Sequence, residues 1–409
     1  METLRFLMVS THYPPYHLGG DATMVKYLAE ELVRMGHEVH VYHNPSVYLL
    51  LRGEKPRNNI TESGFVTRHE YLPKDRRIDL LNSLSFGSWP RARKELNSLA
   101  GRLKPDIVHW HNTKGFVDRP YEIPGTATLY TAHDYYLVCP RSNLLRPNRQ
   151  VCHEPKNCLL CTLRWGKPPQ LWRSGSSRVL QLPEHASGIA PSEFIASRLR
   201  LEGVGICGVI RNFVPDPGIG SLANIRNRNV LLYLGMMEPH KDPETLLEGF
   251  RLSQEKHEFG LVFVGEGSQR GFIEQRVKST GLGDRVRVTG FLPQEDLERL
   301  WKRVGYLVMP SKWFENAPLV VLEAYARGIP VISSDAGGLP EIVCADSGSL
   351  VFNAGDPDSL SKRLEEAWEG IDSLTIVGKK ARDAYERRFR PEIGVSKYLD
   401  LVKNQPPAP

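Results

Sequence analysis

Two glutamates, Glu315 and Glu323, stand eight residues apart in a segment bounded by short apolar runs. Pro318 lies between them and is typical of the first position of a helix, where its missing N–H has no partner to lose. We therefore expect Glu315 on the loop before a helix and Glu323 about one and a half turns inside it. The backbone amides of Asn316 and Leu319 at such a helix start favour an anion such as a diphosphate. Since carboxylates on either side accept hydrogen bonds from hydroxyls, the segment predicts a site for a nucleotide sugar.

The residues around these glutamates narrow the interpretation. A glutamate pair by itself is equally typical of an exposed helix with a capping glutamate. However, ENAPLVVLEA (315–324), ARGIPV (326–331) and the following Gly337–Gly338 together closely resemble the signature of retaining family-4 glycosyltransferases. The resemblance implies that Glu315 faces the hydroxyls of the donor sugar and that Glu323 holds the ribose hydroxyls of the nucleotide. For Gly337–Gly338 we expect a role in backbone geometry rather than in ligand contact.

Lys241 is the candidate cation for the phosphate. When a sugar leaves its diphosphate, negative charge grows on the phosphate, and a nearby cation lowers the barrier. A lysine is by itself more typical of the solvated surface, but the resemblance implies a phosphate-binding lysine at this position. It also implies an arginine and a glycine where this chain has Met236 and Asp242. One expected cation is therefore missing, and His240 or a residue near Gly19 are candidates to replace it.

Three catalytic candidates follow from the same resemblance. Thr131, His133 and Asp134 match the family's Thr-x-His-Asp pattern at the end of a predicted strand. A lone histidine at a strand end is usually an ordinary polar residue, but in this family it contacts the donor sugar near the reacting carbon. The family is commonly explained by front-face attack, in which the leaving phosphate takes the acceptor's proton and no metal is needed. We therefore expect His133, Asp134 and Glu315 at the reacting centre, with no side chain as general base.

Three glycine-containing loops complete the expected donor site. Gly19–Gly20 follow the first predicted strand and precede Asp21, a candidate N-cap, so they form either an ordinary tight turn or a loop close to an anion. The resemblance implies that this loop lies over the donor diphosphate. Gly265 follows a strand at 261–264 and is expected to line the donor pocket. Near Leu292 the resemblance implies contacts to the base that come mostly from backbone atoms.

A cysteine cluster departs from the family pattern. Four of the six cysteines fall within 23 residues, and the last two have the C-x-x-C spacing typical of half a structural zinc site; the four are Cys139, Cys152, Cys158 and Cys161. An iron–sulfur cluster and unrelated or redox-paired thiols are the alternatives, and His153 is a substitute ligand. The segment begins five residues after Asp134, so we expect it to border the acceptor side of the site. Cys207 and Cys344 are expected to be isolated buried thiols.

The predicted elements that must position these residues alternate between strands and helices. Strands are expected at 4–10, 38–42, 106–110, 128–131, 230–234, 261–264, 285–288, 306–309 and 330–333. A linker at 215–229 separates two α/β units, and Pro391 divides the last segment into two helices. The chain thus resembles the GT-B fold, which has two Rossmann-like domains facing a central cleft and a C-terminal helix returning to the first domain. We expect an acceptor domain at 1–214, with the cysteine insertion at 139–161 and completed by 386–409, and a donor domain at 215–385.

Composition excludes some classes of protein. The chain has 409 residues and a net charge of +6, but its basic residues are scattered and no recognition-helix motif is found, so no nucleic-acid partner is expected. The N-terminus lacks the features of a signal peptide, and no apolar run approaches the ~20 residues of a membrane-spanning helix. We expect a cytoplasmic protein with reduced thiols. Residues 76–104 mix apolar and basic side chains, which fits either peripheral contact with an anionic membrane or a helix packed on the core.

These patterns lead to one main functional hypothesis. The chain is expected to be a retaining, hexosyltransferase-type glycosyltransferase that moves a sugar from a nucleoside diphosphate donor to a hydroxyl of a glycan or lipid-linked acceptor, in the synthesis of cell-surface polysaccharide or glycolipid. One alternative is a catalytically weak protein that binds nucleotide sugars or glycans. Another is a nucleotide-sugar epimerase of similar fold, which would need no acceptor.

Overall fold

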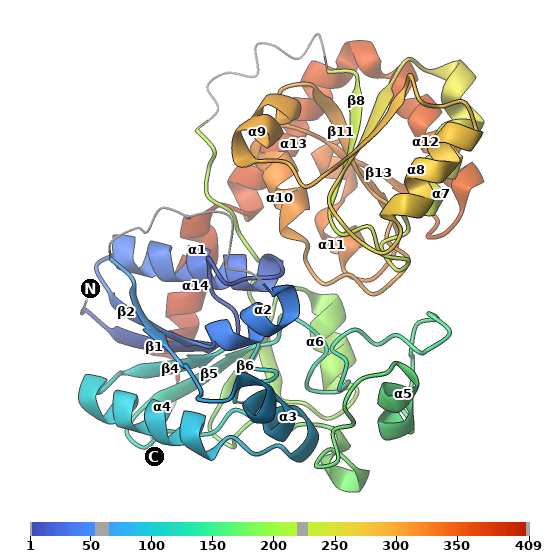
Figure 1. Ribbon diagram of the computed structural model, residues 1–409. Helices are drawn as coiled ribbons and strands as arrows, with labels where there is room; N and C mark the ends of the chain where they lie inside the picture. Colours follow the sequence, from blue (N-terminus) through green and yellow to red (C-terminus); the bar gives the residue numbers. More distant parts are fainter. Residues whose placement is uncertain (1, 54–64, 118, 219–227, 406–409) are drawn as a thin grey trace. The chain divides into compact units, whose positions relative to one another are not determined.

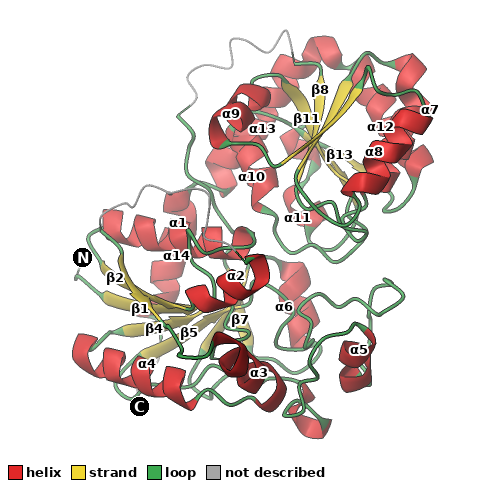
Figure 2. Ribbon diagram, viewed as in Figure 1, coloured by secondary structure: helices red, strands yellow, loops and turns green. Residues whose placement is uncertain are grey.

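The structure, a computed structural model, describes residues 2–53, 65–117, 119–218 and 228–405 (Figure 1). The chain divides into two compact units, Met1–Phe213 with Pro391–Pro409, and Val214–Arg390. Both units are parallel sheets with helices on their faces, as expected for two Rossmann-like domains (Figure 2). Residues 219–227 of the predicted linker and the last residues of the predicted C-terminal segment, 406–409, lie outside the described residues.

Unit 1 contains a seven-stranded sheet in the order β3-β2-β1-β4-β5-β6-β7. Its central strands are almost entirely buried, because helices cover both faces of the sheet. The order reverses between β1 and β4, where Phe6 is paired with Val39 on one side and with Ile107 on the other. The strands are β1 (Arg5–Ser10), β2 (Glu38–His43), β3 (Thr67–Glu70), β4 (Ile107–Trp110), β5 (Ala127–Thr131), β6 (Ser187–Ala190) and β7 (Ile206–Val209).

The helices of unit 1 include one from the far end of the chain. Pro391 separates α13 from α14 and so lets the last helix turn back to unit 1. There the hydroxyl of Tyr398 lies 2.9 Å from Nδ1 of His109 on β4. The helices are α1 (Gly20–Arg34), α2 (Pro45–Arg52), α3 (Arg76–Phe86), α4 (Pro90–Leu103), α5 (Cys158–Arg164), α6 (Glu193–Arg200) and α14 (Pro391–Lys403), with a 3-10 turn η1 (Gly175–Arg178).

Unit 2 contains a six-stranded sheet in the order β10-β9-β8-β11-β12-β13, which reverses between β8 and β11. Its core lies between the sheet and helices α7, α8 and α12, and includes Phe250, Phe259 and Leu360. The strands are β8 (Val230–Leu234), β9 (Gly260–Val264), β10 (Val286–Gly290), β11 (Val304–Met309), β12 (Val331–Ser334) and β13 (Leu350–Phe352). The helices are α7 (Pro243–Ser253), α8 (Arg270–Ser279), α9 (Gln294–Trp301), α10 (Leu319–Ala326), α11 (Leu339–Ile342), α12 (Pro357–Glu369) and α13 (Leu374–Arg388), with 3-10 turns η3 (Gln254–Lys256), η4 (Ala345–Ser347) and η5 (Ile371–Ser373).

Some predicted helix starts differ in detail. Pro318 stands one residue before α10 with ψ 123°, so the helix begins at Leu319 rather than at the proline. Asp21 is not an N-cap, because α1 already begins at Gly20. An aspartate directly before a proline, as at Asp242–Pro243, typically caps the helix that follows. Asp242 does precede α7, but its backbone is left-handed and its carboxylate accepts from the hydroxyl of Thr245 instead of from a backbone amide.

Candidate functional site

In unit 2 the predicted donor residues gather at the carboxyl ends of four adjacent strands. Lys241 follows β8, Gly265 follows β9, Leu292 follows β10 and Glu315 follows β11. In open α/β sheets, ligands bind at this edge, at the point where the strand order reverses. Lys241 and Glu315 stand on either side of that point.

Lys241 and Glu315 form a buried ion pair. Nζ of Lys241 lies 2.6 Å from Oε1 of Glu315, and the hydroxyl of Ser311 donates to the same oxygen at 2.5 Å. Burial works to raise the pKa of Glu315, but the charge of Lys241 and the hydrogen bonds that the carboxylate accepts outweigh it and hold the pKa below its usual value. The structure therefore pairs the predicted phosphate cation with the predicted sugar contact.

A second cation lies in the same loops. Nζ of Lys312 is 3.0 Å from Oδ1 of Asp242, and the amide of Lys312 donates to the carbonyl of His240 at 3.0 Å. The ring of Trp313 packs against His240, with 4.9 Å between the ring centroids, and Nζ of Lys241 lies 5.1 Å from the centroid of the same indole. Lys312 was not predicted from the sequence. The available signal was Asp242, which directly follows Lys241 in the sequence. A carboxylate next to a phosphate-binding lysine needs a cationic partner of its own, and Lys312 is that partner.

The start of α10 places the remaining predicted contacts. Leu319 is the first residue of α10 and Asn316 lies on the loop before it, while Glu323 is half-buried one turn inside the helix. Burial raises the pKa of Glu323, although the charge of Arg327 acts in the opposite direction. A half-buried carboxylate at the helix start is placed to accept hydrogen bonds from hydroxyls.

Two glycines let the loops of this site approach one another. Gly337 has φ +65°, and a Cβ there would overlap the backbone N and O of Glu315, while the amide of Gly338 donates to the carbonyl of Glu315 at 2.6 Å. Gly265 has φ +136°, and its Cβ would overlap the carbonyl of Gly235 after β8. Close backbone packing thus accounts for both glycines.

In unit 1 the polar residues gather at the corresponding edge of the sheet. His111 and Asn112 follow β4, and His133 and Asp134 follow β5. Nδ1 of His111 lies 3.0 Å from Nε2 of His133. The amide of Asn112 donates to Asp134 at 3.0 Å and to Asp21 at 3.1 Å, so one side chain joins two carboxylates that are far apart in the sequence.

Burial keeps the histidines of this cluster neutral. It lowers the pKa of His133 to about 4 and that of His109 to about 3, and it holds the pKa of His111 well below the usual value. Burial also raises the pKa of Asp134 to about 6. His109, His111 and Asn112 were not predicted from the sequence, although the two polar residues directly after the predicted strand 106–110 were a signal.

Gly19 and Gly20 lie where the first helix starts. Gly19 precedes α1 in an extended conformation, with φ −158°, and Gly20 is the first residue of the helix. Any residue adopts such an extended backbone, so the turn itself does not require glycine at position 19.

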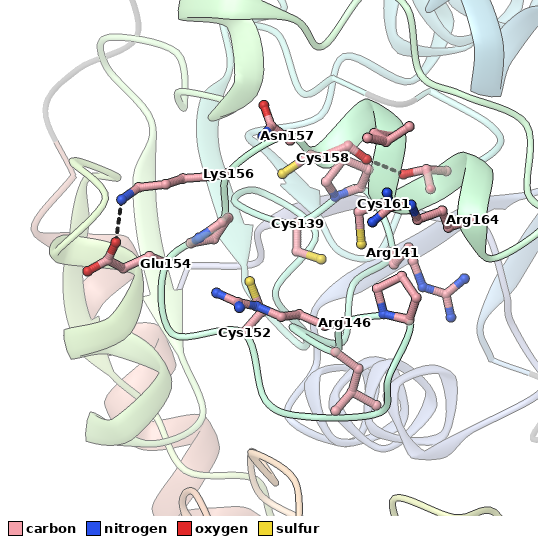
Figure 3. A pocket seen from close by; sticks show the side chains of 16 residues that line it. Cys139, Arg141, Arg146, Cys152, Glu154, Lys156, Asn157, Cys158, Cys161 and Arg164 are labelled. Carbon is pink, nitrogen blue, oxygen red and sulfur yellow. Dashed lines mark hydrogen bonds and ion pairs between the residues drawn. The ribbon is translucent and has the colours of Figure 1, made fainter.

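The four clustered cysteines line one cavity of about 300 Å³ (Figure 3). All four are free thiols, and burial is the main cause that raises the pKa of Cys158, to about 11. Among the described residues, no group of three or more His, Cys, Asp or Glu side chains is already arranged to hold a metal ion. His153 does not line this cavity. The prediction of two isolated buried thiols was wrong, because Cys207 is exposed and Cys344 is half-buried beside Arg388.

Sequence comparison connects these two units to known proteins. Residues 18–216 match the family described as Glycosyltransferase Family 4, and residues 220–384 match Glycosyl transferases group 1. The chain belongs to the family 4 glycosyltransferases. An uncharacterized glycosyltransferase of Methanocaldococcus jannaschii is 25% identical to this family 4 glycosyltransferase, over 94% of each chain. O-antigen chain mannosyltransferase B of Escherichia coli is 29% identical over 41% of this chain and 45% of its own.

Solved structures show the same fold. Sucrose-phosphate synthase from Thermosynechococcus elongatus superposes with a TM-score of 0.71 at 19% identity, over 98% of both chains. HepE of Anabaena, solved in complex with UDP-glucose, gives a TM-score of 0.65 at 16% identity, over 98% of this chain and 99% of its own. These structures establish the GT-B fold for this glycosyltransferase.

Proposed function

We propose that this glycosyltransferase moves a hexose from a nucleoside diphosphate sugar to a hydroxyl acceptor and retains the anomeric configuration. The observation that carries the proposal is the buried pair of Lys241 and Glu315 at the reversal of strand order in unit 2. Such a pair offers a cation for a leaving phosphate and an acceptor for sugar hydroxyls. Because HepE of the same fold was solved with UDP-glucose, uridine donors are the first to test.

Donor binding would redistribute the bonds of the ion pair. Nζ of Lys241 would turn from Glu315 to the diphosphate, and Glu315 would then accept from the sugar hydroxyls. Glu323, one turn inside α10, would accept from the ribose hydroxyls. Lys312 would supply further positive charge near the phosphate, because Met236 carries none.

The acceptor side would be contributed by unit 1. The proton of the acceptor hydroxyl would pass to the leaving phosphate, so no side chain has to act as a general base. His133 is held neutral by burial, which suits an imidazole that donates to or accepts from a sugar hydroxyl. The cations that oppose the phosphate charge are lysine side chains, so the proposal assigns no metal to the reaction.

The first experiment is thermal stabilisation of the purified protein by UDP, GDP and ADP and by their sugar conjugates. A ligand at a hundred times its Kd adds about 2.7 kcal/mol of stability, which raises the melting temperature by several degrees. We expect a shift with one nucleotide family that is lost in Glu323→Ala. Glu365→Ala is the matched control, since Glu365 pairs with Lys256 away from the site. No shift with any nucleotide would contradict the proposed donor site.

Product analysis separates transfer from the alternatives. Retention predicts that the new glycosidic bond has the anomeric configuration of the donor, which NMR of the product measures. An epimerase would release an altered donor without any acceptor. The exposed side chain of Met236, in place of an arginine, is the observation that favours a weak binding protein, which would bind donor without turnover.

We also propose that the acceptor is presented at a membrane surface. Ile78, Leu81 and Phe86 of α3 are between 49% and 58% exposed, and Arg76 and Arg77 start the same helix. By contrast, Leu96 of α4 is buried, so only the α3 part of the segment 76–104 suits membrane contact. In the described residues, no helix has the length and apolarity to cross a bilayer.

Co-sedimentation with anionic liposomes tests this contact. We expect Ile78→Ser with Phe86→Ser to abolish sedimentation. The control is Leu252→Ser, which removes a 40% exposed leucine from α7 of unit 2 and should have no effect. Absence of sedimentation for the unaltered protein would end the membrane proposal, while the donor proposal would stand.

A further inference from the structure

We propose that the four clustered cysteines bind one divalent zinc-type cation as a tetrathiolate site that fastens α5 to the loop after β5. Cys139 and Cys152 belong to that loop, while Cys158 and Cys161 belong to α5. All four side chains line the same cavity of about 300 Å³ (Figure 3). The inference rests on residues 139–166 and is independent of the proposed donor chemistry.

Helix α5 presents its thiols on one side. Cys158 and Cys161 are three residues apart and so lie on the same face of the helix, toward the cavity. Leu160 also lines the cavity but is 48% exposed, and Leu159 and Leu163 are 37% and 50% exposed. Because these leucines are only partly buried, a further interaction would help to hold this seven-residue helix in place.

The loop that faces α5 has a strained backbone. Four of the six non-glycine residues with left-handed φ in the described part of the chain lie between the first and the third clustered cysteine; they are Ser142, Leu144, Arg149 and Asn157. A single isolated β-bridge, between Leu145 and Val151, is the regular pairing found in this loop. Unfavourable backbone conformations persist where the surrounding structure fixes them, and a metal crosslink fixes both sides at once.

The charges around the cavity suit an anionic centre. Four thiolates around a divalent cation carry net negative charge, and Arg141, Arg146, Arg164 and Lys156 line the cavity. Glu154 also lines it, but it is paired with Lys156 at 2.6 Å. Nε of Arg141 is buried without a hydrogen-bond partner among the described residues. A metal-bound thiolate is an acceptor that would satisfy such a donor.

Metal binding has to draw the sulfurs together, since the thiols are not yet arranged around one point. Rotation about χ1 moves each Sγ between staggered positions without moving the backbone. Each of the four thiols would lose its proton to solvent and form one bond to the cation, with no change of oxidation state.

The test is the metal content of the full chain. The protein is purified under reducing conditions without chelator, and elemental analysis is combined with titration of free thiols. We expect one zinc ion per chain and four thiols that become reactive after chelation. When the stripped chain is titrated with Co²⁺, we expect the absorption bands of tetrahedral cobalt thiolate.

Single-cysteine variants assign the ligands. Cys158→Ser and Cys161→Ser are expected to lose the cobalt thiolate bands, whereas Cys207→Ser, which alters an exposed thiol of the same unit, retains them. The titration of the unaltered chain decides the question even if a variant fails to fold. A reduced chain that takes up neither zinc nor cobalt overturns the proposal. Iron and acid-labile sulfide in the purified chain would also overturn it, because they would show that the cysteines hold an iron–sulfur cluster. A nucleotide-induced thermal shift in the same preparation reports on unit 2 separately.

Discussion

The two sheets carry their polar residues at the same place, the carboxyl ends of the strands beside the reversal of strand order, but they treat charge in opposite ways. In unit 2, Lys241 and Glu315 are held as a charged pair by proximity and hydrogen bonding. In unit 1, burial keeps His133 neutral and raises the pKa of Asp134. The edge of unit 2 therefore offers a cation, which suits a phosphate, whereas the edge of unit 1 offers neutral imidazoles and the carboxylate of Asp134, which suit an uncharged hydroxyl. The same architecture can serve both tasks because charge is set by local partners, not by the fold.

Removing the cation of unit 2 should have the largest effect. Lys241→Ala leaves the buried carboxylate of Glu315 without its charge partner, which destabilises a protein by about 3–5 kcal/mol, and we expect transfer to be lost as well. Chemical denaturation and turnover measure the two effects. Lys256→Ala is the control, since Lys256 is 63% exposed and its partner Glu365 is not fully buried, and it should cost much less stability. The double variant Lys241→Met with Glu315→Gln removes both charges, so it should regain stability but not transfer. If Lys241→Ala were as stable as the unaltered protein, the contrast between a charged pair in unit 2 and neutral histidines in unit 1 would be wrong.

Acid should act mainly on unit 1. Histidines 109, 111 and 133 take up protons near pH 6.5 when unfolded, but only at much lower pH when folded. Unfolding therefore binds protons between about pH 6.5 and about pH 4, and each histidine contributes a loss on the order of 1 kcal/mol per pH unit as the pH falls. Asp134 opposes this in part, because its folded pKa of about 6 is raised.

Hydrogen exchange at about pH 7 and about pH 5 distinguishes the units. Unit 2 has two of the 13 histidines, His240 and His257, and the pKa of His257 is lowered to about 4. We expect protection to fall further in β4 and β5 than in β8 and β11. An equal loss in both sheets would remove the electrostatic contrast between the units.

Gly337→Ala should displace Glu315, because both residues belong to unit 2 and their backbones are in contact. A left-handed alanine costs about 1–2 kcal/mol, and the new Cβ must also push the backbone of Glu315 aside. We expect a larger loss of transfer than of stability. Gly281→Ala has the same backbone cost with nothing within 4 Å, so it separates the two effects. Equal turnover in both variants would show that the position of Glu315 does not matter.

Asn112→Ala should have the smallest effect of the series. It removes the donor shared by Asp21 and Asp134, but Asp134 still accepts from the amide of Tyr136 at 2.7 Å, so we expect a loss of about 1 kcal/mol. The pKa of Asp134 should rise further, which would shift the pH dependence of activity upward. Asn148→Ala, on an exposed turn, is the control. An unchanged pH profile would mean that Asn112 does not set the charge of this edge.

The sequence predicted best what is encoded locally. The strands, the order of the two units and the loop that bears Lys241 follow from short patterns of apolar residues, prolines and glycines. The contacts of His109 could not be predicted, because its partners Thr131 and Tyr398 come from another strand and from the last helix. The left-handed backbone of Asp242 was missed for a related reason, since Lys312, the partner of its carboxylate, lies on another loop.

The return of α14 to unit 1 has a consequence for synthesis on the ribosome. Unit 2 is one continuous stretch, Val214–Arg390, whereas unit 1 needs residues from both ends of the chain. Unit 2 can therefore fold as soon as it has emerged, while the buried hydroxyl of Tyr398 reaches His109 only after α14 has been translated. Unit 1 is thus begun first but completed last. Until α14 has been made, His109 on β4 of the nascent chain lacks its partner Tyr398.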